Sequence, residues 1–159
     1  KAVEDPAYKD DFPITGINWF DGLKWCNARS EMEGLAPAYY LDADKTKVYR
    51  RGGALDRIRI EATMVDWRAK GYRLPTEAEW EKAARGGVTG LQYPNGPVLD
   101  KSFAFYGQGR GGWRIVQGVG KLEPNGFGLY DTLGNAWEMC YDWFWKNSHF
   151  LVPSATLIA

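Results

Sequence analysis

Residues 71–87 read GYRLPTEAEWEKAARGG, and this stretch carries the clearest local signal in the sequence. Thr76 stands three residues before Glu79, which is the spacing of a capping box, in which each side chain bonds the backbone amide of the other residue. Gly86 follows the last polar turn, as glycine commonly does after the end of a helix. The pattern therefore predicts a short helix over residues 77–85.

Three glutamates of this predicted helix belong to a residue type that general acid–base catalysis uses: Glu77, Glu79 and Glu81. A structural role explains them better. Glu79 is the capping partner, and acidic residues in a first turn interact favourably with the helix dipole. Neighbouring positions two apart also do not share a helix face. We therefore predict that these glutamates stabilise the helix.

A second helix is predicted upstream, within PITGINWFDGLKWCNARSEMEGL (residues 13–35). Asn18 is a suitable N-cap, with Asp21 three residues later, and Gly34 follows the last polar turn, so we expect a helix from about residue 19 to residue 33. Its expected inner face consists of Leu23, Cys26, Ala28 and Met32.

The remaining sequence predicts short strands and loops. Residues 36–67 mix β-prone runs with glycine and charge, which indicates short strands or extended loops. Residues 86–100 and 106–126 are punctuated by glycine and proline and are predicted to be loops. In AWEMCYDWF (residues 136–144) the aromatic residues and methionine fall on alternate positions, which predicts a strand with an aromatic face.

The composition excludes several classes of protein. Twenty Lys and Arg balance twenty Asp and Glu, so no overall charge attracts nucleic acid, and no segment resembles a membrane span of about 20 apolar residues. Because His149 is the one histidine in the sequence, zinc hydrolase sites, two-histidine iron sites and Ser-His-Asp triads are excluded for this chain by itself. Cys26 and Cys140 form no CxxC pair, and either a disulfide or two buried thiols would fit.

A candidate metal site lies in LYDTLGNAWE (residues 129–138). This stretch offers two carboxylates and two backbone carbonyls around a bend that glycine permits, and Ca²⁺ prefers such hard oxygen ligands. The candidate ligands are Asp131, Gly134, Ala136 and Glu138. From spacing alone, an ordinary turn with a solvated aspartate and a glutamate paired to an arginine explains the pattern equally well.

Two other short patterns indicate function less specifically. The tripeptide Glu123-Pro124-Asn125 is one by which many sugar-binding C-type lectins hold calcium, but such use needs further oxygen ligands on a nearby strand. Residues 106–112, YGQGRGG, are similar to a phosphate-binding glycine loop but lack the strand, the following helix and the lysine of a P-loop.

Together, residues 71–87 and PNGFGLYDTLGNAWEMCYDWF (residues 124–144) strongly resemble the formylglycine-generating enzyme family, also called the sulfatase-modifying factor family. The resemblance implies an α+β fold, an irregular variant of the C-type lectin fold with two short helices, short antiparallel strands and many loops. It places an incomplete domain at residues 12–143, after an N-terminal extension over residues 1–11 and before a divergent tail over residues 144–159.

The resemblance also implies a structural calcium site. In the family, the stretch similar to residues 131–138 holds calcium through side chains at Asp131 and Glu138 and through backbone oxygens at Gly134 and Ala136. Calcium is therefore favoured over an ordinary turn. The tripeptide at residues 123–125 falls in the loop that precedes the family's GLYD motif, so it is not expected to bind sugar.

Members of this family differ in activity. Some oxidise a sulfatase cysteine to formylglycine with copper held by two cysteines, and others form sulfoxides at an iron site in a separate domain. Further members, including hypervariable proteins made by diversity-generating retroelements, only display a binding surface, and fold alone does not choose among these. The segment with the copper-binding cysteines has no counterpart after Trp143, and Cys26 and Cys140 do not occupy those positions.

We therefore predict a calcium-stabilised binding or structural module. The alternative is part of a copper-dependent oxidase, or of a related sulfoxide synthase, whose catalytic segment lies outside this chain; copper is expected only in that case. The expected partner is a protein or peptide, recognised by a loop that contains Tyr106, Arg110, Trp113 and Arg114. A second expected partner is a chain that completes the sheet, because unpaired terminal strands leave exposed edges. Neither nucleic acid nor a membrane span is expected.

Overall fold

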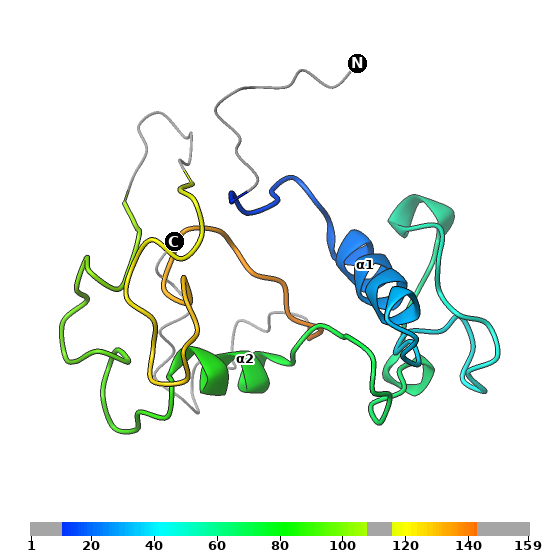
Figure 1. Ribbon diagram of the computed structural model, residues 1–159. Helices are drawn as coiled ribbons and strands as arrows, with labels where there is room; N and C mark the ends of the chain where they lie inside the picture. Colours follow the sequence, from blue (N-terminus) through cyan, green and yellow to red (C-terminus); the bar gives the residue numbers. More distant parts are fainter. Residues whose placement is uncertain (1–10, 108–115, 143–159) are drawn as a thin grey trace, which may run out of the picture. The chain divides into compact units, whose positions relative to one another are not determined.

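A computed structural model of the protein describes residues 11–107 and 116–142. The chain forms two compact units, each with one α-helix (Figure 1). The α1 unit is Gly16–Pro75, and the α2 unit combines Lys1–Thr15 with Thr76–Ala159. No helix in the described part of the chain is both long and apolar enough to cross a bilayer.

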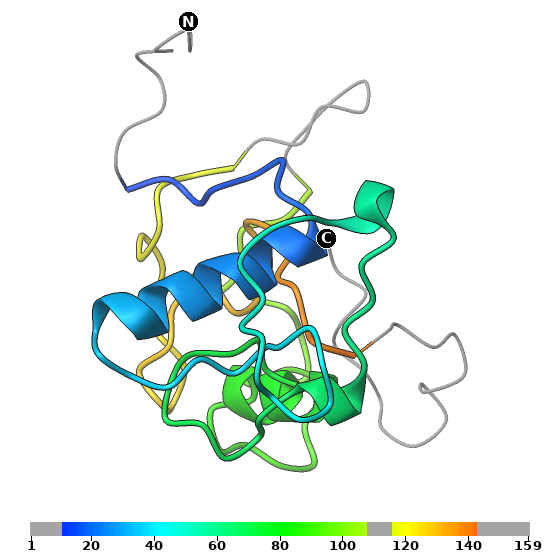
Figure 2. The same ribbon diagram turned by 90° about the vertical axis from the view of Figure 1, so that its right-hand side faces the viewer.

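Helix α1 spans Trp19–Met32, within one residue of the predicted bounds, and is seen lengthwise in blue in Figure 2. Its start is a capping box: Asn18 Oδ1 accepts a hydrogen bond from the amide of Asp21 at 3.1 Å, and Asp21 Oδ2 accepts one from the amide of Asn18 at 3.1 Å. The helix ends where Gly34 adopts a φ of +70°. Both signals are local, which is why the sequence predicted them.

The inner face of α1 was predicted only in part. Leu23 and Cys26 are buried as expected, but Ala28 and Met32 are exposed, Met32 to 83%. The face is completed instead by Asn27 and Ser30, both 0% exposed. These four buried positions repeat every three or four residues, as one helical face requires. The prediction failed because it considered only apolar residues as candidates for the core.

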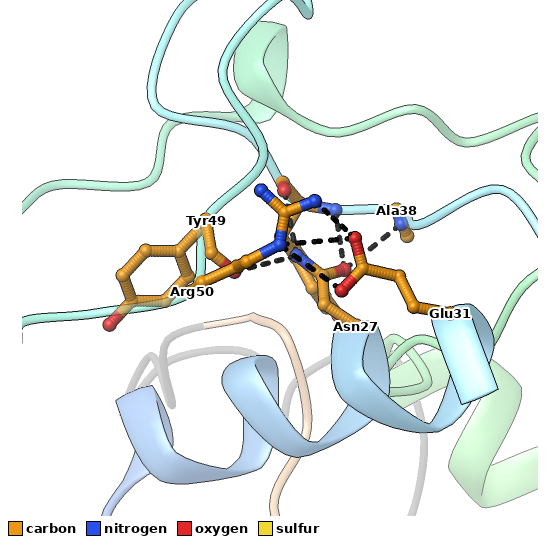
Figure 3. Close-up of polar contacts among 6 residues, drawn as sticks. Asn27, Glu31, Ala38, Tyr49 and Arg50 are labelled. Carbon is orange, nitrogen blue, oxygen red and sulfur yellow. Dashed lines mark hydrogen bonds and ion pairs between the residues drawn. The ribbon is translucent and has the colours of Figure 1, made fainter.

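Asn27 uses both lone-pair sites and both amide hydrogens of its side chain (Figure 3). Oδ1 accepts hydrogen bonds from the amides of Ala38 and Tyr39 at 3.1 and 3.0 Å. Nδ2 donates to the carbonyl oxygens of Tyr39 and Tyr49 at 2.8 and 2.9 Å. One buried side chain therefore links the segments at residues 38–39 and 49 to α1. In a sheet, backbone hydrogen bonds between strands would make such links.

Ser30 makes a second polar link one turn later. Its hydroxyl donates to the carbonyl of Cys26 at 2.7 Å and accepts from the amide of Tyr72 at 2.7 Å. Next to it, the amide of Gly71 donates to the carbonyl of Ala36 at 3.1 Å. A Cβ at Gly71 would lie 2.2 Å from that carbonyl oxygen, so the close approach requires glycine.

The apolar core of the described residues belongs mainly to the α1 unit. Two tyrosines, Tyr39 and Tyr49, are fully buried. The hydroxyl of Tyr39 accepts from the amide of Leu74 at 2.8 Å, and the hydroxyl of Tyr49 donates to the carbonyl of Gly52 at 2.7 Å. The other buried apolar residues of this unit are Leu23, Cys26, Ala38, Ile60 and Val65.

Short antiparallel strands were predicted, but the described residues contain isolated bridges in their place. These pair Tyr39 with Val65, Tyr40 with Val48 and Tyr93 with Gly96 in the antiparallel sense, and Phe105 with Gly134 in the parallel sense. Of the strand predicted over residues 136–144, residues 136–142 form no bridge among the described residues, and residues 143–144 lie outside them. Alternation indicates an extended segment, but only a paired neighbour makes it a strand. Two 3₁₀ helices, η1 (Ala54–Asp56) and η2 (Ala62–Met64), were not predicted.

Helix α2 spans Glu77–Ala84, one residue shorter than predicted, with Arg85 as its C-cap. The predicted capping box is confirmed: the Thr76 hydroxyl accepts from the amide of Glu79 at 3.2 Å, and Glu79 Oε2 accepts from the amide of Thr76 at 2.9 Å. Glu81 pairs with Arg85 at 2.6 Å. Glu79 and Glu81 thus have the structural roles expected of them.

Asn125 closes the other end of α2. Its Nδ2 donates to the carbonyl oxygens of Ala83 and Ala84 at 2.8 and 3.0 Å. Its Oδ1 accepts from the amides of Phe127 and Leu129 at 2.9 and 3.1 Å. The Asn125 side chain therefore makes all four of these hydrogen bonds with backbone groups of the α2 unit.

We expect Thr76→Ala to lower the free energy of unfolding by about 1 kcal/mol, because it removes one side of the α2 capping box. Urea denaturation followed by circular dichroism measures the change. Thr89→Ala is the matched control, since Thr89 lies exposed in the same unit after the helix. Equal stability of the two variants would show that the box contributes nothing.

Candidate metal centre

The α2 unit contains a cavity of about 80 Å³. Its lining includes Glu77 and Trp80 from α2, and aromatic side chains such as Tyr106 and Trp137. All four residues of the predicted calcium site also line it: Asp131, Gly134, Ala136 and Glu138. The fold thus brings these residues to one place, while the identity of any bound ion stays a prediction.

A tight turn shapes this wall of the cavity. Gly134 has a φ of +100°, and the amide of Asn135 donates to the carbonyl of Phe105 at 2.9 Å. A Cβ at Gly134 would lie 2.2 Å from that carbonyl oxygen. The Asn135 side chain bonds the backbone of Gln117 in both directions, accepting from its amide at 2.9 Å and donating to its carbonyl at 3.2 Å. These contacts hold the turn between the two carboxylates.

The carboxylate of Asp131 is only half satisfied. Its Oδ2 accepts a hydrogen bond from the amide of Gly120 at 2.6 Å. Its Oδ1 is buried and has no hydrogen-bond partner in the part of the chain that the structure describes. A buried polar atom without a partner costs free energy and calls for an explanation, of which a bound cation is one.

The carboxylate of Glu138 accepts a hydrogen bond from the indole Nε1 of Trp80 through its Oε2. Burial raises the pKa of this carboxyl, the hydrogen bond from Trp80 lowers it, and the negative charge of Asp131 raises it. The residue as a whole is exposed at the surface, so water moderates the shift. Asp131 and Glu138 line one cavity, and a cation bound between two carboxylates would offset the repulsion between their charges.

The donor set suits a hard cation. No backbone amide of the described residues donates to the carbonyl oxygen of Gly134 or of Ala136. Within residues 11–107 and 116–142, no three His, Cys, Asp or Glu side chains converge on a possible metal position. A site here would combine two carboxylates with carbonyl oxygens, a set of hard oxygen donors that fits Ca²⁺.

The two cysteines carry thiols and are not joined by a disulfide. Cys26 is buried in the α1 unit, and burial raises the pKa of its thiol to about 11. Cys140 lines the cavity, and burial, together with the negative charges of Asp142, Glu77 and Glu138, raises the pKa of its thiol to about 11. Both thiols are therefore protonated at neutral pH when no metal is bound.

The predicted recognition loop is described only at one end. Tyr106 lines the cavity, while Arg110, Trp113 and Arg114 lie outside the described residues. The sequence did not identify Trp80 as part of the site, although Trp80 lies in the capped helix predicted over residues 77–85. Its partner lies 58 residues further along the chain, and no spacing rule connects positions so far apart.

Fold and cavity together define an irregular, loop-rich protein with two α-helices in its described part. Its candidate metal site is a loop that turns at Gly134 beside the short helix α2. The chain belongs to the sulfatase-modifying factor enzyme 1-like domain family, whose model matches residues 2–157. This membership confirms the family that the two sequence motifs indicated.

Individual relatives agree with this assignment. The chain is 32% identical over 163 residues to Chaperone protein LppX of Paenibacillus barcinonensis, covering 92% of this chain and 56% of LppX. It is 40% identical over 99 residues to the formylglycine-generating enzyme of Thermomonospora curvata, covering 55% of this chain and 33% of the enzyme. Among solved structures, Treponema denticola variable protein 1 superposes with a TM-score of 0.66 at 34% identity, over 84% of this chain and 50% of that chain.

These matches confirm a fold of the formylglycine-generating enzyme type. The chain spans 56% of LppX, 33% of the bacterial enzyme and 50% of the variable protein. Catalytic activity, substrates and partners of the whole relatives are therefore not carried over with the family.

Proposed function

We propose that this chain is a calcium-stabilised binding or structural module of its family, without catalytic cysteines of its own. The observation that carries the proposal is the buried Oδ1 of Asp131, which has no partner among the described residues and belongs to a residue that lines the same cavity as Glu138. Asp131, Glu138 and the carbonyl oxygens of Gly134 and Ala136 would hold the ion. Bound there, Ca²⁺ would supply positive charge to two carboxylates that otherwise repel each other.

The chain's own contacts explain why such an ion would act on structure. Asp131 is bonded to the amide of Gly120, and Glu138 to the indole of Trp80 in α2. Fixing the two carboxylates therefore also fixes the loop at residue 120 and the helix against the turn. A module built in this way keeps irregular loops in one arrangement, which a recognition surface needs.

For the partner, we propose a protein or peptide, bound by the loop that begins at Tyr106. One relative is named a chaperone protein and another a variable protein, so family membership does not by itself imply catalysis. A chain that completes a sheet with this one is the second proposed partner. Size-exclusion chromatography tests it, because a stable monomer contradicts a required partner strand.

We expect Ca²⁺ to raise the melting temperature of the protein relative to a chelator. Ligand at about 100 times its dissociation constant stabilises a folded protein by about 2.7 kcal/mol. Glu138→Gln should lose most of this gain, because it removes one of the two charges at the site. Glu123→Gln is the matched control, since Glu123 is exposed in the same unit and should respond as the wild type does. An unchanged melting temperature of the wild type contradicts the proposal.

A second candidate is favoured by the 40% identity to an enzyme named formylglycine-generating enzyme. In that case the chain is part of a copper-dependent oxidase, or a related sulfoxide synthase, whose metal ligands lie outside it. This alternative expects a longer reading frame with paired cysteines beyond Trp143, and Cu(I) binding by the complete protein. A complete reading frame without such cysteines eliminates it.

A further inference from the structure

We propose that the indole N–H of Trp80 and the amide of Gly120 are positioning donors, which reserve one oxygen of each carboxylate for the cation. The ligating atoms are then Oδ1 of Asp131 and Oε1 of Glu138, and each carboxylate binds through a single oxygen. This inference rests on the proposed calcium site and names the atoms that build it.

For Asp131, the two carboxylate oxygens differ in environment. Oδ2 accepts from the amide of Gly120 at 2.6 Å, a short contact typical of a bond to a charged acceptor. Oδ1 is buried and has no partner within the described residues. Binding through both oxygens would make Oδ2 share its lone pairs between the amide and the ion, whereas binding through Oδ1 leaves the hydrogen bond to Oδ2 unchanged.

Glu138 repeats the arrangement. Its Oε2 accepts from Nε1 of Trp80, and no other described residue donates to the carboxylate. Trp80 lines the same cavity from its half-buried position on α2. Oε1 is therefore the oxygen left to a cation, and the indole holds the carboxylate in the orientation that presents it.

Trp80 can act in this way because α2 is held at both ends. At the start of the helix, Asp142 Oδ2 accepts from the amide of Glu77 at 2.6 Å, in addition to the capping box. At its end, the Asn125 side chain donates to the last carbonyls. The helix that carries the indole is thus bonded at its start to Asp142, four residues after Glu138.

Single-oxygen binding affects the choice of ion. Ca²⁺ takes about six to eight oxygens and accepts carboxylates through one or both, whereas Mg²⁺ requires near-octahedral geometry with single-oxygen ligands. Trp80 therefore holds Glu138 in a form that both ions accept. Without the indole N–H, Oε2 is free to join the coordination, which favours Ca²⁺ over Mg²⁺.

We expect Trp80→Phe to weaken Ca²⁺ binding about 10-fold, as loss of an outer donor typically does, and to weaken Mg²⁺ binding more. The ratio of Ca²⁺ to Mg²⁺ affinity, measured by isothermal titration calorimetry, should rise. Trp25→Phe is the control, because Trp25 is 58% exposed on α1, and it should leave both affinities unchanged. General damage to the fold would weaken both ions without raising the ratio.

A nuclear magnetic resonance measurement on the wild type gives an independent readout. The indole N–H resonance of Trp80 should stay protected from solvent exchange when the protein is saturated with Ca²⁺, because its bond to Oε2 persists. Loss of protection at saturation overturns the inference, as does an unchanged affinity ratio in Trp80→Phe. Failure of the wild type to bind Ca²⁺ overturns the calcium proposal itself, so the two failures are distinguishable.

Discussion

Replacing Asn27 by leucine is expected to lower the free energy of unfolding of the α1 unit by about 3 kcal/mol or more. Leucine fills a similar volume but has no polar atoms. The amides of Ala38 and Tyr39 would lose their acceptor, and the carbonyl of Tyr49 would lose its donor, at a side chain that is 0% exposed. Each buried group left without a partner costs about 1–3 kcal/mol.

Urea denaturation measures this loss, and hydrogen exchange locates it. The amide hydrogens of Ala38 and Tyr39 should exchange faster than in the wild type. Glu31→Ala is the matched control on the same helix, because it removes the ion pair with Arg50 that is drawn beside Asn27 in Figure 3. That pair is solvent-exposed and should cost less than about 1 kcal/mol. If the two variants were equally stable, Asn27 would not be the link we describe.

Gly71→Ala is expected to cause a loss of similar size, about 3 kcal/mol. The added Cβ would lie 2.2 Å from the carbonyl oxygen of Ala36 and 2.4 Å from the hydroxyl oxygen of Ser30. The carbonyl oxygen of Ala36 is a backbone atom, and it cannot move away without breaking its hydrogen bond from the amide of Gly71. Moving the Ser30 side chain would also disturb its hydroxyl, which accepts a hydrogen bond from the amide of Tyr72.

Gly53→Ala separates this effect from the general cost of changing a glycine. Gly53 lies in the same unit with extended backbone, and its nearest neighbour would be 3.9 Å from an added Cβ. Thermal or urea denaturation should show a near-neutral change for Gly53→Ala and a large loss for Gly71→Ala. Similar losses in both would mean that the close approach at residue 71 relaxes easily.

Asn27 and Gly71 show which features of the fold could not be predicted from the sequence. The two helices and their caps were predicted to within one residue, because a capping box joins positions three residues apart. Asn27 was not recognised as a core residue, since its partners lie 11 to 22 residues away and it is polar. Hydrophobic periodicity finds apolar faces but cannot indicate which polar side chains the fold will enclose.

The candidate metal site, too, was predicted only in part from the sequence. The sequence, through its resemblance to a family, indicated the residue types and the order of Asp131, Gly134, Ala136 and Glu138. Which oxygen of each carboxylate is left for an ion depends on the amide of Gly120 and the indole of Trp80, 11 and 58 residues away from their acceptors. Only the packed structure brings such donors together.

By itself, then, the sequence determined the family, the two capped helices and the order of the oxygen donors in the loop at residues 131–138. Each of these features depends on short runs of neighbouring residues, which can be recognised without the fold. The tertiary structure decided that Asn27 and Ser30 replace apolar residues in the α1 face, and that Gly71 must remain glycine. It also decided that Trp80 reaches the carboxylate of Glu138. These features depend on contacts between distant segments, whose geometry is set only when the chain has folded.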